Sequence, residues 1–279
     1  MLPEYPKFKE LEITDKNDVE SITSKYPPYS DFNFVSLWSY NTKNEFFISK
    51  LNDNLVVKLL DYLKLVPFYS FIGDNSTFDT ISKLLNKSVK ESLKPSLRLI
   101  PEDNLKKDRD EITKRFKIKE DKNNYDYILS LKDLSELRCH KFFTKRKLVK
   151  RFHKMYPNCK IEEIEPYDKK QQTKIIDLFM TWQMNSKKKY KDIEVELTAT
   201  KRLLESARYF NLFCMGIFDN NKLISYSIEE PLNNGFVMGH FGKADINYLG
   251  IYQTIQNESA THLFNKGYKY LNKCVADSF

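Results

Sequence analysis

The feature that most constrains the fold is the stretch Phe236–Glu258, in which a buried strand leads through a short loop into a helix. The apolar run 236–243 is typical of a buried strand, and Gly250 marks the start of the helix. The first backbone N–H groups of a helix have no partner within it. Together with the positive end of the helix dipole, they can hold a negatively charged group. The stretch therefore predicts a candidate anion site beside Gly250.

A repeated order of elements predicts two domains. Each half reads as a strand, one or two helices, three antiparallel strands, a helix and a strand. The hairpin turn at 52–54 in the first half matches the turn at 219–221 in the second. We therefore predict an α+β fold of two tandem domains, each a mixed, mainly antiparallel sheet flanked by helices. The predicted boundaries are 1–137 and 158–279, joined by a basic linking helix at 138–157.

The predicted linking helix is the most basic part of a chain whose net charge is +8. Four of its aromatic and aliphatic residues recur at helical spacing, which predicts one buried face. These are Phe142, Val149, Phe152 and Tyr156. The cations on the other faces could bind the phosphates of a tRNA or an anionic lipid headgroup. Alternatively, the helix bridges two domains and its outer face is only solvated. The cations assigned to phosphate binding are Lys141, Lys145, Arg146, Lys147, Lys150 and Arg151.

The sequence does not predict a secreted or membrane-spanning chain. Residues 1–18 carry charges every few positions, unlike a signal peptide, and no stretch approaches the roughly 18 uninterrupted apolar residues of a membrane span. The four cysteines lack CxxC spacing and the four histidines are scattered, so we predict no metal site. We expect a cytoplasmic protein with reduced cysteines that could also work at a membrane surface. The sequence does not specify an oligomeric state.

Several segments of the chain resemble one known family. Residues 241–264, FGKADINYLGIYQTIQNESATHLF, are similar to the Lys-Ala-Asp … Gly-x-Tyr-Gln-x-x-Asn segment of proteins related to the phosphatidylglycerol lysyltransferase C-terminal domain. FNFVSLWSYN near Phe32, the segment from Tyr125 to 152 and KLISYSIEEPL from Lys222 extend the resemblance over nearly the whole chain. It implies tandem GNAT-like domains, akin to the Fem-type aminoacyltransferases. It also implies transfer of an acyl group, in particular an aminoacyl group from aminoacyl-tRNA, to an amine or hydroxyl acceptor such as a phospholipid headgroup.

The same resemblance implies a set of site residues. The substrate-binding candidates are Lys243, Asp245, Gly250, Tyr252, Gln253 and Asn257. His240 and Glu229, on neighbouring predicted strands, are the candidate catalytic acid–base pair. The competing interpretation is that His240 is an ordinary core histidine and that Glu229 flanks a turn before Pro231. No tightly bound cofactor is expected, because aminoacyl-tRNA is a substrate.

Two other functions fit the sequence. In an acetyl-CoA-dependent N-acetyltransferase, the loop Asn247–Tyr252 would hold the pyrophosphate of coenzyme A, as the Q/R-x-x-G-x-G/A loop of GNAT proteins does. Tyr252 stands where a very small residue is needed for the backbone to approach a phosphate, which argues against that function. The third function is a non-catalytic module that binds nucleic acid or an anionic membrane through Arg138–Lys154.

The resemblance ends shortly after Tyr268–Asn272. In relatives the strand continues into a run of Arg and acidic residues followed by Leu-Gly, whereas Lys273–Phe279 does not match. We therefore expect a C-terminal domain that lacks its last strands, as in a truncated member of the family.

Overall fold

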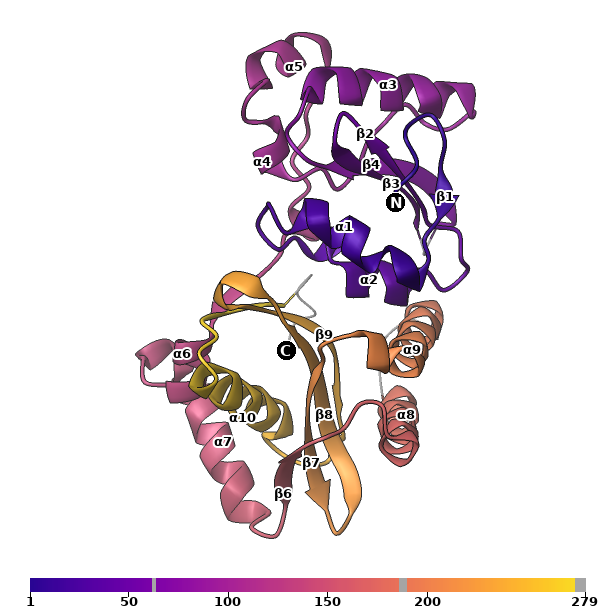
Figure 1. Cartoon of the computed structure of the whole chain (residues 1–279). Helices are drawn as coiled ribbons and strands as arrows, with labels where there is room; N and C mark the ends of the chain where they lie inside the picture. Colours follow the sequence, from indigo (N-terminus) through magenta and orange to yellow (C-terminus); the bar gives the residue numbers. More distant parts are fainter. Residues whose placement is uncertain (62–63, 186–189, 274–279) are drawn as a thin grey trace. The chain divides into compact units, whose positions relative to one another are not determined.

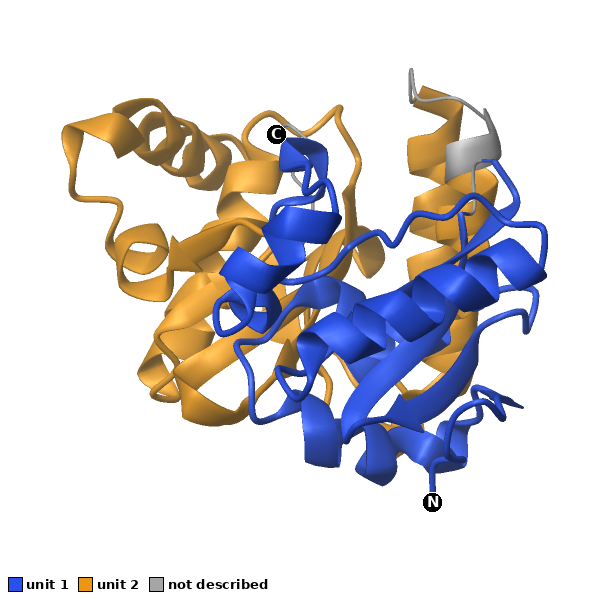
Figure 2. Ribbon diagram, turned by 90° about the horizontal axis from the view of Figure 1, so that it is seen from above, with its two compact units in different colours: residues 1–125 blue, residues 126–279 orange. Residues whose placement is uncertain are grey.

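The computed structural model describes residues 1–61, 64–185 and 190–273. The chain divides into two compact units, which Figure 2 shows in blue and orange. Unit 1 is Met1–Tyr125 and unit 2 is Asp126–Phe279. Each unit has its own sheet and its own apolar core. This arrangement agrees with the prediction of two α+β domains.

Unit 1 is built on a four-stranded sheet in the order β1-β2-β3-β4, in which every neighbouring pair is antiparallel. Its strands are β1 (Lys9–Glu10), β2 (Phe47–Leu51), β3 (Asn54–Asp61) and β4 (Val66–Ile72). Its helices are α1 (Lys16–Thr23), α2 (Phe34–Tyr40), α3 (Thr77–Lys90), α4 (Glu102–Leu105) and α5 (Arg109–Arg115). The apolar side of α3 packs on Val56, Tyr69 and Phe71 of the sheet, and this contact forms part of the core of unit 1.

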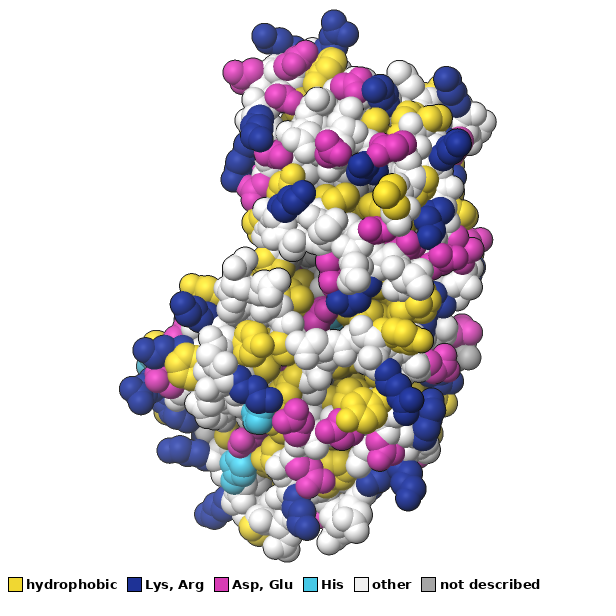
Figure 3. All heavy atoms as spheres, viewed as in Figure 1, with side chains coloured by type: hydrophobic (Ala, Val, Ile, Leu, Met, Phe, Trp, Pro, Cys, Tyr) yellow, Lys and Arg dark blue, Asp and Glu magenta, His cyan; other side chains and the backbone are white. Residues whose placement is uncertain are grey.

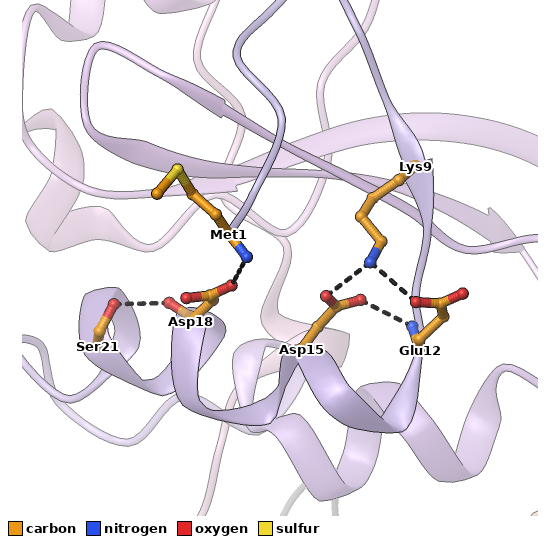
Figure 4. A network of polar contacts seen from close by, with 6 residues as sticks. All are labelled: Met1, Lys9, Glu12, Asp15, Asp18 and Ser21. Carbon is orange, nitrogen blue, oxygen red and sulfur yellow. Dashed lines mark hydrogen bonds and ion pairs between the residues drawn. The ribbon is translucent and has the colours of Figure 1, made fainter.

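The start of α1 is fixed by a polar network around Asp15 (Figure 4). The Asp15 carboxylate accepts hydrogen bonds from the backbone N–H of Glu12 at 2.9 Å and from Lys9 Nζ at 2.8 Å. Asp15 is only 3% exposed, so its charge requires such partners. The hydrogen bond to Asp15 is the main reason why the pKa of Lys9 is raised. The network ties β1 to the first turn of the helix that follows it.

Unit 2 is built on a six-stranded sheet in the order β5-β10-β9-β8-β7-β6, and only the pair β9–β10 is parallel. Its strands are β5 (Ile128–Ser130), β6 (Lys160–Glu163), β7 (Phe213–Asp219), β8 (Lys222–Pro231), β9 (Phe236–Ala244) and β10 (Tyr270–Asn272). Its helices are α6 (Leu131–Glu136), α7 (Phe143–Met155), α8 (Lys169–Asn185), α9 (Tyr190–Glu205) and α10 (Ile251–Asn265). Helices α6, α7 and α10 cover one face of this sheet, and α8 and α9 lie on the other (Figure 1). We call them the α10 face and the α8 face.

The observed boundary between the units lies twelve residues before the predicted end of the first domain at 137. Strand β5 pairs with β10, and Leu131 and Leu134 of α6 are buried in the core of unit 2. Helix α7 also belongs to this unit, because Val149 and Phe152 are buried and Phe152 lies in the same core. The predicted linking helix is therefore a packed helix of unit 2. The sequence does predict a strand at 126–130, but it does not show that this strand pairs with β10 and so belongs to unit 2.

Both units share one topology, as the repeat predicted. A strand, two helices, three antiparallel strands and a helix follow one another in each. Both predicted hairpins are two-residue turns with positive φ at both residues, at Asn52–Asp53 and at Asn220–Asn221. Unit 1 also has a parallel bridge from Tyr69 to Leu97, at the place of the β9–β10 pair. The sequence also predicts that the C-terminal domain lacks its last strands after Asn272. Residues 274–279, on which this prediction bears, lie outside those the structure describes.

Strand β9 lies between β8 and β10 in the sheet. Residues 236–238 of β9 pair with Tyr270–Asn272, and β9 pairs with β8 from Val237 to Ala244. The chain then turns at Asp245 and enters α10 at Gly250. The second half of β9 carries His240 and Lys243 and leads directly into this turn.

Candidate active site

The predicted acid–base residues lie on opposite faces of the sheet. Successive side chains of a strand alternate between its two faces. Glu229 Oε1 accepts a hydrogen bond from Ser259 Oγ of α10 at 2.9 Å, which places Glu229 on the α10 face. The next residue, Glu230, points to the other face and meets His240, whose Nε2 lies 3.2 Å from Glu230 Oε2. The structure therefore pairs His240 with Glu230, and it does not bring Glu229 and His240 together.

A β-bulge explains why His240 meets Glu230 and not Glu229. Ile228 pairs with Phe241 and Glu229 pairs with Gly239, so that His240 is an extra residue in β9. A bulge re-aims the side chains around it. In an unbroken register His240 would stand opposite Glu229. No motif in the sequence reveals the extra residue.

Glu229 is a carboxyl group held in an apolar environment. Burial raises its pKa to about 7, although the hydrogen bond from Ser259 opposes this shift. Its second oxygen, Oε2, is buried and has no hydrogen-bond partner among the described residues. A carboxyl group in such a position is more stable in its protonated form.

We expect Glu229→Gln to make the protein more stable at alkaline pH. The folded-state pKa lies above the ordinary value of 4.5, so the folded protein keeps a proton that the unfolded chain releases. Stability from this group is therefore full below pH 4.5 and is lost as the pH rises through 7. At pH 8 the variant should gain about 1–2 kcal/mol, because glutamine stays neutral but remains a buried polar group. Urea unfolding at pH 5 and pH 8 measures this, and an equal effect at both pH values would contradict it.

Lys243 lies in a closely packed cluster on the α8 face. Its Nζ forms an ion pair with Glu196 of α9 and lies 4.3 Å from the ring centroid of Trp182 and 5.2 Å from that of Phe179. The Lys243 side chain is 6% exposed and that of Glu196 is 18% exposed. Tyr226, which pairs with Lys243 across the strands, is fully buried. These contacts show that Lys243 joins α8 and α9 to the sheet. Its partners Glu196 and Trp182 are not among the residues predicted from the sequence.

Two further candidates have structural partners within unit 2. Asp245 accepts hydrogen bonds from the backbone N–H and the side-chain Nδ2 of Asn247, at 3.1 and 2.8 Å, and so shapes the turn before α10. Asn257 donates from Nδ2 to the carbonyl oxygens of Leu134 and Ser135, at 2.7 and 2.8 Å, and so caps the end of α6. Asp245 therefore fixes the backbone of the turn before α10, and Asn257 fixes the backbone at the end of α6.

Tyr252 and Gln253 lie in the first turn of α10. Burial raises the pKa of the Tyr252 phenol, while hydrogen bonds with the Trp182 side chain and the Ala244 backbone oppose that shift. Tyr252 thereby links α10 to the cluster around Lys243. The Gln253 side chain is half-buried and makes no hydrogen bond with another described residue. Among the predicted substrate-binding side chains on α10, Gln253 is therefore the one whose amide is available to form a hydrogen bond with a substrate.

The backbone before α10 is covered by α7. Gly250 has φ +86°, and a Cβ atom there would lie 2.5 Å from the carbonyl oxygen of Leu148. The N–H of Leu249 points to the hydroxyl of Tyr156 at 3.4 Å, and the rings of Tyr156 and Tyr248 lie 4.9 Å apart. The glycine that the sequence linked to an anion is thus required for close packing of two helices. A carbonyl oxygen at this point disfavours a phosphate there.

The cations assigned to phosphate binding fall into two groups. Lys141 pairs with Asp133 at 3.2 Å, Lys145 donates to Gln256 Oε1 at 3.3 Å, and Arg146 donates to the Leu137 carbonyl oxygen. Lys147, Lys150 and Arg151 are exposed, as is Lys154, and none of them forms an ion pair within the part of the chain that is described. In the space-filling view, Lys and Arg side chains lie along the edge of unit 2 that α6 and α7 form (Figure 3).

Two kinds of feature are absent from the described residues. Among residues 1–61, 64–185 and 190–273, no three His, Cys, Asp or Glu side chains converge as a metal site would require. Within the same ranges, every helix is too short or too polar to cross a bilayer. The prediction of a cytoplasmic location stays a prediction.

The order of elements, the parallel β9–β10 pair and the helix α10 that connects these two strands define a tandem GNAT-type fold, related to that of the Fem-type proteins. The chain belongs to the family "Phosphatidylglycerol lysyltransferase, C-terminal", whose model matches residues 23–277. This confirms the resemblance seen in the sequence.

Solved structures agree with this assignment. A conserved protein from Bacteroides thetaiotaomicron is similar over 99% of this chain and 90% of its own, with a TM-score of 0.82 and 23% identity. L-PGS from Bacillus licheniformis matches over 95% of this chain and 77% of its own, with a TM-score of 0.58 and 13% identity. FemX matches over 98% and 89%, with a TM-score of 0.53 and 9% identity. At these identities the likeness establishes the fold. A search of curated protein sequences finds no match.

Proposed function

We propose that this protein is an aminoacyltransferase that moves an aminoacyl group from aminoacyl-tRNA to an amine or hydroxyl acceptor such as a phospholipid headgroup. Membership of the lysyltransferase family supports the reaction class. The observation that supports the choice of donor is the packing at Gly250, where a Cβ would lie 2.5 Å from the carbonyl oxygen of Leu148, so that α7 lies against this backbone. We expect the donor to be held by other parts of the molecule.

The chemistry of this transfer asks little of the protein. An aminoacyl ester is already activated, so the acceptor can attack its carbonyl carbon directly. The protein must orient the two substrates, take a proton from the acceptor and stabilise the oxyanion that forms. In this proposal His240 takes the proton, and Gln253 contributes a hydrogen-bonding amide to substrate binding.

The exposed stripe of α7 is the proposed contact with tRNA. Phe143, Lys147, Lys150 and Lys154 recur at intervals of four, three and four residues, so they lie along one face of the helix. Phe152, which is fully buried, lies on the opposite face. Three unpaired cations in a row suit a phosphate backbone, and an exposed aromatic ring beside them suits stacking on a base. These properties favour nucleic acid over a solvated bridge.

Charge reversal on this stripe should lower the affinity for tRNA and should also make the affinity less dependent on salt concentration. Replacing Lys147, Lys150 and Lys154 by Glu removes about three phosphate contacts, so the slope of log K against log salt should fall by about two to three units. Filter binding of charged tRNA at several salt concentrations measures the slope. The matched control reverses Lys170, Lys201 and Arg208, which are exposed elsewhere on unit 2 and change the net charge equally. Equal slopes for the two triple variants would contradict the assignment to α7.

The alternative donor is tested by thermal stabilisation. A coenzyme A-dependent N-acetyltransferase would be stabilised by acetyl-CoA well above its Kd, because a ligand that binds only the folded state shifts unfolding. We expect no shift of the melting temperature at millimolar acetyl-CoA. A clear, saturable shift would overturn the proposal of a closed site at Gly250 and restore the acetyltransferase function.

A further inference from the structure

The extra residue in β9 places one histidine and one carboxylate together on the α8 face. His240 and Glu230 side chains are 3% and 5% exposed, and His240 Nε2 lies 3.2 Å from Glu230 Oε2. Among the described residues Glu230 is the one hydrogen-bond partner of this imidazole. β-bulges re-aim the side chains of a strand and are common next to active sites.

The chemistry of the pair fixes which nitrogen of the histidine carries the proton. An ionised carboxylate only accepts hydrogen bonds, so a neutral imidazole must donate to Glu230 from Nε2. The lone pair is then on Nδ1, which has no partner among the described residues. A base needs such a lone pair at a defined position to take a proton from a substrate.

The geometry points to Glu230 as the positioning residue of the proposed reaction: it holds His240 in the Nε2–H tautomer, with Nδ1 as the base. This inference rests on the proposed function. In the reaction, the acceptor N–H or O–H gives its proton to Nδ1 while its heteroatom forms a bond to the ester carbonyl carbon. The bond from that carbon to the ribose oxygen of tRNA then breaks, and the ribose oxygen receives the proton from His240. The imidazole returns to its starting tautomer, and no further reactant is needed.

The position of the pair in the sheet agrees with this role. His240 is the extra residue of β9 opposite β8, two residues after Met238, which pairs with Asn272 of β10. Gly239, just before it, lies close to β10, since a Cβ there would be 3.5 Å from the carbonyl oxygen of Asn272. The imidazole therefore lies on the part of β9 that leads towards the turn before α10. The buried pair of Lys243 and Glu196 lies further along the same face and already has its own partners.

The first test is the tautomer itself, measured without substrate. In ¹⁵N NMR spectra the shifts of the two imidazole nitrogens report which one is protonated, and the chain has only four histidines to assign. The His240→Gln spectrum identifies the signals of His240 by their loss. We expect the Nε2–H tautomer in the unmodified protein and a mixture in Glu230→Gln, since a glutamine amide can either donate or accept. An Nδ1–H tautomer in the unmodified protein would overturn the inference.

The second test is kinetic and uses aminoacyl-tRNA as donor. Glu230→Gln keeps the shape of the pair, and we expect kcat to fall about 100-fold or more with little change in KM. Glu230→Gln combined with His240→Gln should be no worse than His240→Gln alone, because the two residues act as a unit. The control, Glu162→Gln on the exposed surface of β6, should keep both constants. Full kcat in Glu230→Gln would refute the positioning role.

The two tests separate the inference from the function on which it rests. A protein that transfers no aminoacyl group but shows the expected tautomers would refute the proposed function and retain the pair. A protein that transfers aminoacyl groups with equal kcat in Glu230→Gln would retain the function and refute the pair. Melting temperatures of the variants show whether a loss of kcat reflects unfolding, and Glu230→Asp, which keeps the charge, should then restore part of the rate.

Discussion

Replacing Lys243 by Met should lower the free energy of unfolding of unit 2 by about 3–5 kcal/mol. The substitution keeps the aliphatic volume but removes the ammonium group that faces Glu196, Trp182 and Phe179. Glu196 then keeps a charge in a position where it is only 18% exposed, and that desolvated charge loses its ion-pair partner. Urea unfolding followed by tryptophan fluorescence measures the change, because Trp182 lies in the cluster itself.

A double substitution distinguishes a buried ion pair from simple packing. Lys243→Met with Glu196→Leu removes both charges, and we expect it to recover most of the lost stability. Lys266→Met provides the matched control, since the side chains of Lys266 and its partner Glu163 are 49% and 48% exposed and lie 3.7 Å apart. It should cost less than about 1 kcal/mol. A loss of under 1 kcal/mol in Lys243→Met would contradict the account of this cluster.

Replacing Gly250 by Ala should cost about 3–4 kcal/mol and loosen α7 from unit 2. The residue has φ +86°, which disfavours any side chain, and the new Cβ would overlap the Leu148 carbonyl at 2.5 Å. That oxygen is backbone within a helix, so the overlap can be relieved only by movement of α7 or of the loop. Denaturant unfolding gives the energy, and hydrogen exchange of the amides in Phe143–Met155 reports the loosening.

Gly267 offers the control for the backbone conformation alone. It has φ +95° after α10, and a Cβ there meets no atom within 4 Å. Gly267→Ala should therefore cost about 1 kcal/mol, from the strained φ only. The excess cost at Gly250 then measures the contact with α7. If the two variants were equally stable, Gly250 would not be a packing residue, and a phosphate site beside it would again deserve a test.

Much of the fold can be predicted from local patterns in this sequence. The turns at Asn52–Asp53 and Asn220–Asn221 use the residues that tolerate positive φ, so both hairpins are visible without a structure. The stripe of Phe152 and its neighbours on α7 has a helical period and is buried as predicted. The boundary at 125 escaped prediction because the partner of β5, strand β10, lies about 140 positions later in the chain.

The candidate site was harder to predict, because its contacts depend on single residues and on how distant elements pack. The sequence marks Gly250 as a glycine with a structural role, and its φ of +86° agrees with this. A glycine at a helix start can allow close approach of a phosphate or of a neighbouring helix. The position of Leu148 favours the neighbouring helix, and it cannot be predicted from the sequence. His240 was named with Glu229 because both lie on neighbouring predicted strands, and the sequence alone does not fix the register between these strands. One inserted residue in β9 changes the partner to Glu230. Glu196 and Trp182 come from helices whose contact with β9 depends on tertiary packing.

The central claim is that the donor is aminoacyl-tRNA, and one transfer experiment tests it most directly. Purified protein is incubated with anionic phospholipid vesicles or a soluble amine, and with either tRNA charged with labelled amino acids or labelled acetyl-CoA. We predict label from aminoacyl-tRNA in the acceptor fraction, its loss in His240→Gln, and none from acetyl-CoA. Transfer of the acetyl label, with none from any aminoacyl-tRNA, would contradict the account.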